Sequence, residues 1–238
     1  MSIDDAVAAS EKQFWLPLES NPEVLNDFAL KLRASPSHVF HDIFGLDAEL
    51  LAMVPQPAVA VLLLFPSDEM SAAKAAQLER LRGEGYAPEP GLFFMRQFVG
   101  NACGTIATIH ALCNNSFLLD PASDLGAFLE ANLALDADAR GANLARAGFI
   151  SAATSESAQG GQTAAPEVGA DVNHHFVAFV AHQGNVYELD GTKPWPINHG
   201  PVGEGGLLAS AAEVIKKEYI EIIGADGLFN MMALAAAE

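Results

Sequence analysis

The sequence predicts a domain of the α/β (α+β) class, in which layers of helices pack on a sheet. Two segments carry this prediction. Residues 58–65 (AVAVLLLF) are a short apolar run bounded by prolines, which is typical of a buried strand. Residues 102–113 (ACGTIATIHALC) are apolar on nearly all sides, and a helix with that pattern lies inside its domain. A buried strand and a buried helix in one chain favour a three-layer arrangement.

Length and composition narrow the class of protein further. At about 150 residues per domain, 238 residues lie between one domain and two, and we expect a single domain over residues 1–238. Half of the residues are hydrophobic and 18% are charged, which excludes a wholly disordered chain. Two cysteines are too few for a disulfide-stapled domain or a four-cysteine zinc module. The longest apolar run is far shorter than the roughly 20 residues of a membrane span, and no signal-peptide pattern is visible.

The first half of the chain predicts helices on either side of the buried strand. Residues 22–33 read as an amphipathic helix, with Asn21 as its N-cap and Pro22 at its first position. A short helix is expected over residues 47–54. Residues 68–82 predict a surface helix that two glycines bring to an end.

The second half alternates further helices and strands. The expected elements are an extended segment at 92–98, the buried helix at 102–113, helices at 122–133, 135–149 and 207–222, a hairpin over 175–189, and a last core strand at 228–236.

One stretch, residues 151–173 (SAATSESAQGGQTAAPEVGADVN), breaks this alternation. Its residues are small and polar, and it contains glycine. A structureless stretch of this length is usually a functional loop or a linker. A linker would separate two self-sufficient halves, whereas the candidate chemistry lies on both sides. We therefore expect a mobile loop over the active site.

Cys103 is a candidate nucleophile because it begins the buried helix. Unpaired N–H groups and the positive end of the helix dipole stabilise a thiolate at that position. A small buried core residue is the alternative interpretation for any free cysteine. Cys113 lies roughly 15 Å further along the same helix, too far for a disulfide, and reads as a core residue.

Gln97 is a candidate oxyanion donor, six residues before Cys103. Its side-chain amide and the backbone N–H of Cys103 together could hold the negative oxygen of a tetrahedral intermediate.

The predicted hairpin supplies a base and a group that orients it. A two-residue turn at Gln183–Gly184 makes paired positions sum to 367, so His175 and Asp190 lie on one face as diagonal neighbours, about 7–8 Å apart at Cα. A histidine and an aspartate close that gap with a hydrogen bond, as a Cys–His–Asp mechanism requires. His174 points to the opposite face.

The remaining histidines have ordinary interpretations. His38 and His41 are expected in a loop, His110 in the core, His182 at the end of the hairpin and His199 in a loop. A metal site built from His174, His175 and His182 is the alternative, but strand alternation separates the first two, so we expect no metal and no cofactor.

Charge excludes some partners. The 30 acidic residues against 12 basic ones give a net charge of −18. Such a surface repels nucleic acids and anionic lipids and favours a cationic partner, although solubility alone is an alternative explanation.

Five long segments carry a resemblance that covers nearly the whole chain. They are residues 14–28 (FWLPLESNPEVLNDF), 47–66 (DAELLAMVPQPAVAVLLLFP), 96–112 (RQFVGNACGTIATIHAL), 173–180 (NHHFVAFV) and 187–200 (YELDGTKPWPINHG). Together they resemble the ubiquitin C-terminal hydrolases, papain-like cysteine peptidases that cut after the C-terminal glycine of ubiquitin. The resemblance implies a helix–β-sheet–helix sandwich with a knotted backbone. It also makes residues 151–173 the crossover loop that restricts the leaving group to small or flexible adducts.

Carried over residue by residue, the resemblance makes Cys103 the nucleophile and His175 the general base. Asp190 would orient His175, and Gln97 would donate to the oxyanion. Glu19 and Asp42 occupy positions where members of the family present acids to the arginine-rich tail of ubiquitin.

We therefore expect a thiol-dependent deubiquitinating hydrolase of the short subclass, a monomer whose partner is ubiquitin. Two alternatives stay open: a protein that sequesters ubiquitin with little turnover, and a hydrolase for a ubiquitin-like modifier. A catalytic thiol fits a reducing compartment, so we expect a cytoplasmic location, with the nucleus as an alternative.

Overall fold

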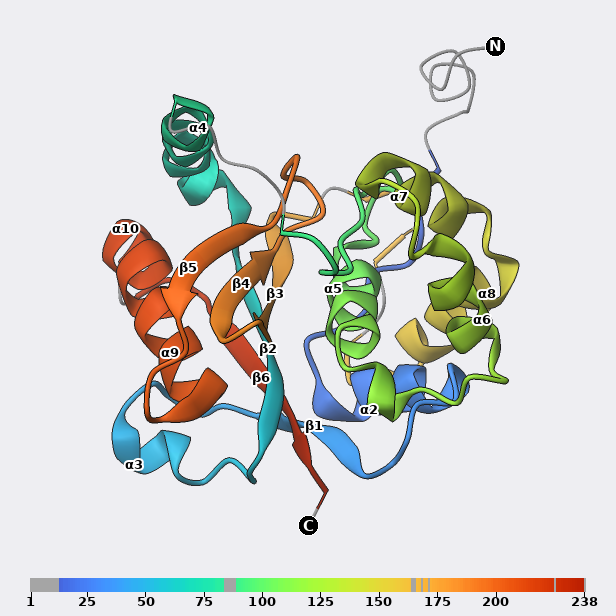
Figure 1. Ribbon diagram of the computed structural model, residues 1–238, viewed down its shortest axis with the longest axis horizontal. Coiled ribbons are helices and arrows are strands. Elements are labelled where there is room, and N and C mark those ends of the chain that lie inside the picture. The colour runs from blue at the N-terminus through green and yellow to red at the C-terminus, as the bar shows by residue number, and fades with distance from the viewer. Residues whose placement is uncertain are drawn as a thin grey trace.

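One antiparallel sheet organises the molecule (Figure 1). The computed structural model describes residues 13–83, 89–163, 166–167, 169–170, 172–224 and 226–237. Within these ranges the strand order is β1-β6-β2-β3-β4-β5. The strands are β1 (His38–Asp42), β2 (Ala58–Pro66), β3 (His174–His182), β4 (Asn185–Leu189), β5 (Ile197–Pro201) and β6 (Asn230–Ala236).

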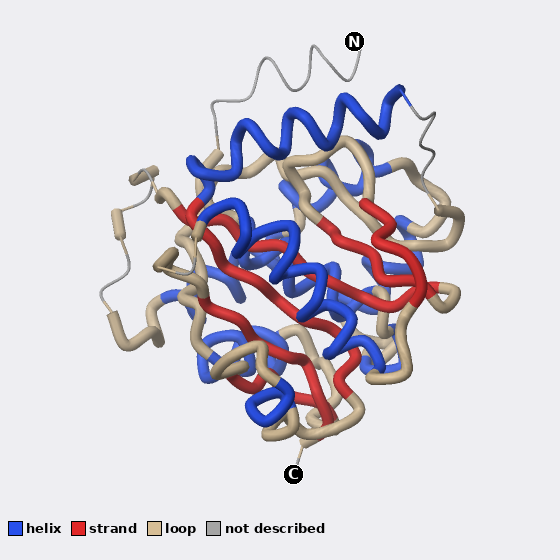
Figure 2. The backbone as a smooth tube through the Cα atoms, turned by 90° about the vertical axis from the view of Figure 1, so that its left-hand side faces the viewer, coloured by secondary structure: helices blue, strands red, loops and turns tan. Residues whose placement is uncertain are grey.

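Helices cover both faces of this sheet. One layer holds α2 (Pro22–Lys31), α5 (Cys103–Cys113), the 3-10 turn η1 (Ser116–Leu118), α6 (Asp124–Asn132), α7 (Ala137–Arg146) and α8 (Gly148–Ala158). The other side holds α3 (Ala48–Leu51), α4 (Ser67–Gly83), α9 (Gly206–Ile215), the π-helical turn η2 (Lys216–Ile220) and α10 (Glu221–Ile223). Figure 2, turned to face this second side, shows a helix crossing in front of the twisted strands. The predicted helix–sheet–helix sandwich is confirmed.

The core consists of two apolar clusters, one on each face of the sheet. Alternate residues of β2 point to opposite sides, so that Leu62 joins the cluster under α5 and Leu63 joins the cluster under α9. In β3, Ala178 and Val177 divide in the same way. Covering on both faces explains why β2 is a continuous apolar run rather than an alternating one.

The helix α5 packs closely on β3 because small residues face the strand. A Cβ on Gly104 would lie 3.2 Å from the ring of Phe176 and 3.3 Å from Leu18, so only glycine fits without displacing these side chains. His110, inside α5, is fully buried and its Nε2 accepts a hydrogen bond from the backbone N–H of Met95. Burial lowers the pKa of His110 to about 3, so the ring is a neutral core residue as predicted.

The β3–β4 hairpin has the predicted two-residue turn. Both turn residues have positive φ, 47° at Gln183 and 77° at Gly184, as the hairpin turn that matches strand twist requires. The register Ala178↔Leu189 and Val180↔Tyr187 sums to 367, as predicted.

The prediction that residues 151–173 form one structureless loop is wrong for its first third. α8 extends to Ala158, and its small side chains, among them Ala153 and Thr154, are buried. Small residues allow α8 to pack on α2, where the Ser157 hydroxyl donates to Asp27 at 2.6 Å. The described residues between α8 and β3 contain no helix or strand. The helix predicted at 135–149 is in fact α7 followed by the start of α8.

The loop assignments of three histidines are also wrong. His38 and His41 lie on β1, and His199 lies on β5. Neither strand has an apolar run that would mark it in the sequence. Each forms because a neighbouring strand offers hydrogen bonds, as in the pairing His38↔Ala236. The helix predicted at 207–222 is interrupted by the π-helical turn η2.

In the described part of the chain, none of the helices combines the length and the apolar character that a membrane span needs.

The first prediction concerns the helix that supports the chain leading to Cys103. A Cβ on Gly141 of α7 would lie 2.0 Å from the carbonyl oxygen of Arg96. We expect Gly141→Ala to lower the free energy of unfolding by about 1–3 kcal/mol, measured by urea denaturation, because the backbone must move.

The matched control for this prediction is Gly148→Ala, where no atom lies within 4 Å of the new Cβ. We expect this variant to be neutral or more stable by about 0.5–1 kcal/mol. Equal stability of the two variants would contradict the packing described here.

Candidate active site

Cys103 is the first residue of α5, as predicted, and its side chain is partly exposed. The loop before it is fixed by the N-terminal segment, because Gly100 exchanges hydrogen bonds with Gln13 and Trp15 at 2.8 and 3.0 Å. A Cβ on Gly100 would lie 2.3 Å from Phe14, so the approach requires glycine. The helix N-terminus therefore presents the thiol at a fixed position.

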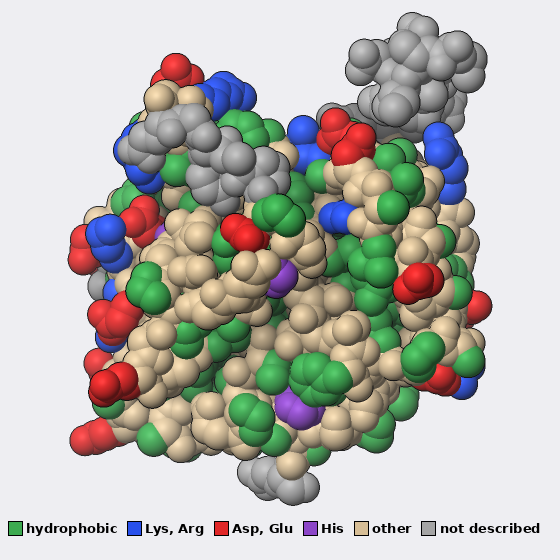
Figure 3. Space-filling view, in the orientation of Figure 1, with side chains coloured by type: hydrophobic (Ala, Val, Ile, Leu, Met, Phe, Trp, Pro, Cys, Tyr) green, Lys and Arg blue, Asp and Glu red, His purple; other side chains and the backbone are tan. Residues whose placement is uncertain are grey.

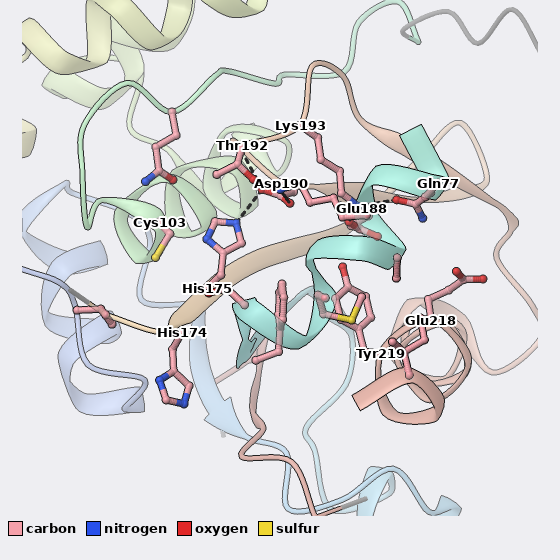
Figure 4. A pocket seen from close by; sticks show the side chains of 18 of the residues that line it. Gln77, Cys103, His174, His175, Glu188, Asp190, Thr192, Lys193, Glu218 and Tyr219 are labelled. Carbon is pink, nitrogen blue, oxygen red and sulfur yellow. Dashed lines mark hydrogen bonds and ion pairs between the residues drawn. The ribbon is translucent and has the colours of Figure 1, made fainter. Parts of the chain in front are cut away.

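His175 and Asp190 form the hydrogen bond that the hairpin register predicts. The two side chains point toward one another (Figure 4), with His175 Nε2 2.7 Å from Asp190 Oδ1. The Asp190 side chain is only 1% exposed. Since Nε2 is occupied by the carboxylate, Nδ1 is the ring nitrogen left for Cys103. His174 points away from this pair, as predicted.

The environment favours a thiolate and an imidazolium. Burial alone raises the pKa of the Cys103 thiol, but the hydrogen bond and charge of His175, with the Phe176 and Gly104 backbone, bring it below the ordinary value. Burial alone lowers the pKa of His175, but the charge and hydrogen bond of Asp190, with a smaller contribution from Cys103, raise it to about 10. Both shifts stabilise the charged forms.

Asp190 remains ionised in this buried position. Burial acts to raise its pKa, but the charge and hydrogen bond of His175, followed by the positive charges of Lys74 and Lys193, hold it well below the usual range. Asp190 Oδ1 also accepts hydrogen bonds from the backbone N–H and the hydroxyl of Thr192, at 2.9 and 2.6 Å.

Gln97 lines the same cavity as Cys103, His175 and Asp190. Its backbone N–H donates to the carbonyl oxygen of Gly191 at 2.8 Å, which ties it to the chain that carries Asp190. Its side-chain Nε2 donates to the Val99 carbonyl at 3.0 Å, and its buried Oε1 has no hydrogen-bond partner among the described residues. No hydrogen bond is found for the second N–H of the amide among the described residues.

Two hollows meet at Cys103. One, of about 370 Å³, is lined by Gln97, His175 and Asp190 and reaches Tyr219. The other continues from Cys103 toward Glu19 and is also lined by Pro17, Leu18, Ala158 and Phe176. A groove therefore crosses the thiol, as an extended substrate chain requires.

The two predicted acidic binding residues lie outside the group formed by Cys103, His175 and Asp190. Glu19 borders the second hollow, and its Oε2 accepts a hydrogen bond from the backbone N–H of Gln162 at 2.7 Å. Asp42 ends β1 opposite Met232 of β6, and burial raises its pKa. Ser20, which follows Glu19 in the chain, donates a hydrogen bond to the side chain of Asn230 at the start of β6. The segment that carries Glu19 and the end of β1 that carries Asp42 therefore both lie near the start of β6.

Sequence reasoning missed the polar network next to His175 and Asp190. Glu188, two residues before Asp190, is buried and paired with Lys193 and His199. Lys74 of α4 reaches Asp190 across 116 residues of sequence. Strand alternation placed Glu188 on the face of Asp190, but no local pattern in α4 pointed to Lys74. Among the described residues, no group of three acidic, histidine or cysteine side chains could hold a metal ion.

Comparison with known proteins identifies relatives along most of the chain. The model of the family described as "Ubiquitin carboxyl-terminal hydrolase, family 1" matches residues 15–220. A "Ubiquitin carboxyl-terminal hydrolase" of Aplysia californica is 43% identical over 87% of this chain and 96% of its own length. The isozyme L1 of Rattus norvegicus is 39% identical over 93% and 98%.

Solved structures share the fold. The catalytic domain of Trichinella spiralis UCH37, bound to ubiquitin vinyl methyl ester, superposes with a TM-score of 0.74 at 23% identity. The match covers 98% of this chain and 99% of that one.

The second prediction concerns the Cys103 thiolate. We expect His175→Asn to raise the pH midpoint of Cys103 alkylation by iodoacetamide by about 1–3 units, because the imidazolium that stabilises the thiolate is gone. The rate is measured from pH 5 to 10 by mass spectrometry of the Cys103 peptide.

Cys113→Ser provides the control for this experiment. Cys113 is buried and burial raises the pKa of its thiol, so its removal should leave the profile unchanged. A midpoint in His175→Asn equal to that of the native protein would contradict the thiolate–imidazolium pair.

Proposed function

The chain belongs to ubiquitin carboxyl-terminal hydrolase family 1, and we propose that Cys103 is the nucleophile with which it hydrolyses bonds at the C-terminal glycine of ubiquitin. The family makes the protein a cysteine-dependent deubiquitinating hydrolase. The observation that carries the residue assignment is the polarised Cys103–His175–Asp190 arrangement, with a 2.7 Å His175–Asp190 hydrogen bond at its centre.

The reaction begins with attack of the Cys103 thiolate on the carbonyl carbon of the ubiquitin glycine. The backbone N–H of Cys103 and the free N–H of the Gln97 side chain hold the resulting oxyanion. His175 then donates its proton to the leaving group as the C–N or C–O bond breaks. An acyl-enzyme remains on Cys103.

Deacylation reverses these roles. His175, now neutral, takes a proton from a water molecule that attacks the thioester. The tetrahedral intermediate collapses and the C–S bond breaks, which restores the thiolate–imidazolium pair. Ubiquitin leaves with a free carboxyl group, which releases its proton to solvent. Asp190 keeps the ring of His175 in one orientation through both halves of the reaction.

We propose that the leaving groups are small or flexible adducts. The segment between α8 and β3 approaches the loop before Cys103, where the Asn101 side chain donates to the carbonyl oxygen of Ala170 at 3.0 Å. This hydrogen bond supports a strap across the groove, under which a bulky folded adduct would not pass.

We also propose that Glu19 and Asp42 attract the arginine-rich tail of ubiquitin. Glu19 borders the groove that leaves Cys103, which supports this role. Acidic side chains are scattered over the face seen in Figure 3 rather than gathered in one patch. We therefore propose that the net charge of −18 attracts the basic tail at long range, in addition to Glu19 and Asp42.

Two free cysteines, one of them the proposed nucleophile Cys103, support a reducing compartment, and we propose a monomer in the cytoplasm. A ubiquitin-like modifier is a second candidate substrate, and comparing its hydrolysis with that of ubiquitin decides between the two. A protein that only sequesters ubiquitin would keep every motif, so the turnover rate separates it from an enzyme.

The third prediction tests the nucleophile with its partner. Ubiquitin carrying an electrophile at its C-terminus should label the native protein one to one and leave Cys103→Ser unlabelled, as read by intact mass. Labelling of the variant, or no binding of ubiquitin by either protein, would contradict the proposal. Binding without labelling would favour sequestration.

The fourth prediction concerns electrostatic attraction. We expect Glu19→Gln and Asp42→Asn each to slow ubiquitin association by roughly two- to threefold at low salt, and added salt to reduce the difference. Stopped-flow fluorescence measures the rate. Glu213→Gln, an exposed acid on α9, is the control for net charge. An association rate of native protein that does not depend on salt would contradict this role.

A further inference from the structure

The helix α4 is held to the active site by polar contacts. Of its residues, only Met70 and Leu81 are buried. Two other side chains, Lys74 and Gln77, lie one turn apart and therefore share a face of the helix. Lys74 bonds Asp190 and Thr192, and Gln77 Oε1 accepts a hydrogen bond from Lys193 Nζ at 2.7 Å. One face of α4 thus contacts the segment that carries the triad aspartate.

The two oxygens of Asp190 have separate partners. Oδ1 receives the His175 ring, together with the backbone N–H and hydroxyl of Thr192. Oδ2 receives Lys74 Nζ at 2.9 Å. The Lys74 side chain is 27% exposed, while that of Asp190 is 1% exposed, so the ion pair is partly shielded from water.

From this geometry we infer that Lys74 is a positioning residue of the active site, which anchors Asp190 Oδ2 and so holds Oδ1 toward His175. The inference rests on the proposed function, because it assigns Lys74 to the same Cys103–His175–Asp190 site. It adds a residue that no part of the catalytic mechanism above uses.

The chemistry of the site gives Lys74 two effects of the same sign on the thiol. Without its anchor, Asp190 is held only through Oδ1, by His175 and Thr192, so the carboxylate is less firmly oriented toward His175. A weaker contact with Asp190 weakens the imidazolium that stabilises the Cys103 thiolate. Without its positive charge, every neighbouring acid releases its proton less readily. Both effects raise the pH at which the thiolate forms.

Other charged and titratable groups also face this site. They are His174 and His175 on β3, Glu188 on β4, Asp190 and Lys193 after it, His199 on β5, Cys103 and His110 on α5, and Glu218 and Tyr219 on η2. None of the basic groups among them contacts Asp190 Oδ2 in the described residues, so no neighbour already in place takes over the contact that Lys74 makes.

The fifth prediction compares three variants. Lys74→Met keeps the length of the side chain and removes its charge, whereas Lys74→Arg keeps the charge. Lys216→Met is the matched control, because Lys216 also makes an ion pair at 2.9 Å, with Glu213, outside the site. Each variant is tested by the pH profile of Cys103 alkylation, by kcat and KM on a ubiquitin amide, and by thermal unfolding.

We expect Lys74→Met to raise the alkylation midpoint by at least about 0.5 pH unit and to lower kcat roughly tenfold with little change in KM. Lys74→Arg should keep an alkylation midpoint and a kcat close to the native values, and Lys216→Met should behave as the native protein. These results would support positioning of Asp190 through Lys74.

Three outcomes would overturn the inference. The first is an unchanged alkylation midpoint and kcat in Lys74→Met, and the second is an equal change of midpoint and kcat in Lys216→Met. The third is a lower melting temperature of Lys74→Met with an unchanged midpoint, which would indicate a structural role alone. Alkylation needs no ubiquitin. A shifted midpoint in Lys74→Met, together with a native protein that does not hydrolyse ubiquitin amides, would therefore support the role of Lys74 and reject the proposed function instead.

Discussion

The hydrogen bond between His175 and Asp190 is the constraint on which the site depends. A carboxylate that is 1% exposed loses nearly all of its hydration, so it must be paired to remain charged. His175, Thr192 and Lys74 supply that pairing. The charge of Asp190 in turn raises the pKa of His175, and the charge of His175 lowers the pKa of Cys103. Each charge is stable because its neighbour is charged, so loss of one member changes the protonation of the others.

The fold brings these groups together from distant parts of the chain. The two-residue turn at Gln183–Gly184 fixes the register of β3 and β4, and the register places His175 and Asp190 on one face. Close packing of α5 on β3, allowed by Gly104, brings the N-terminus of the helix and Cys103 to the same point. A slip of one residue in the hairpin would turn Asp190 to the other face of the sheet. The apolar clusters on both faces of β2 and β3 therefore stabilise the register that the chemistry requires.

Sequence reasoning succeeded where a local pattern determines structure. We predicted a buried strand from the apolar run of β2 and a buried helix from the apolar residues all round α5. The two-residue turn of the hairpin was also predicted, and with it the contact between His175 and Asp190. It failed where tertiary contacts decide. β1 and β5 form because a neighbouring strand offers hydrogen bonds, and α8 forms from small polar residues because it packs on α2. Lys74 was missed because its partner lies 116 residues away, on a different element.

We infer that His175 is an imidazolium at neutral pH because Asp190 and Cys103 stabilise its charged form. The most direct measurement is nitrogen-15 NMR of histidine-labelled protein at pH 7, with the His175 signals assigned from their loss in His175→Asn. We expect both ring nitrogens of His175 to carry protons and to titrate well above the ordinary value of about 6.5. A neutral ring at pH 7 that titrates near 6.5 would contradict it.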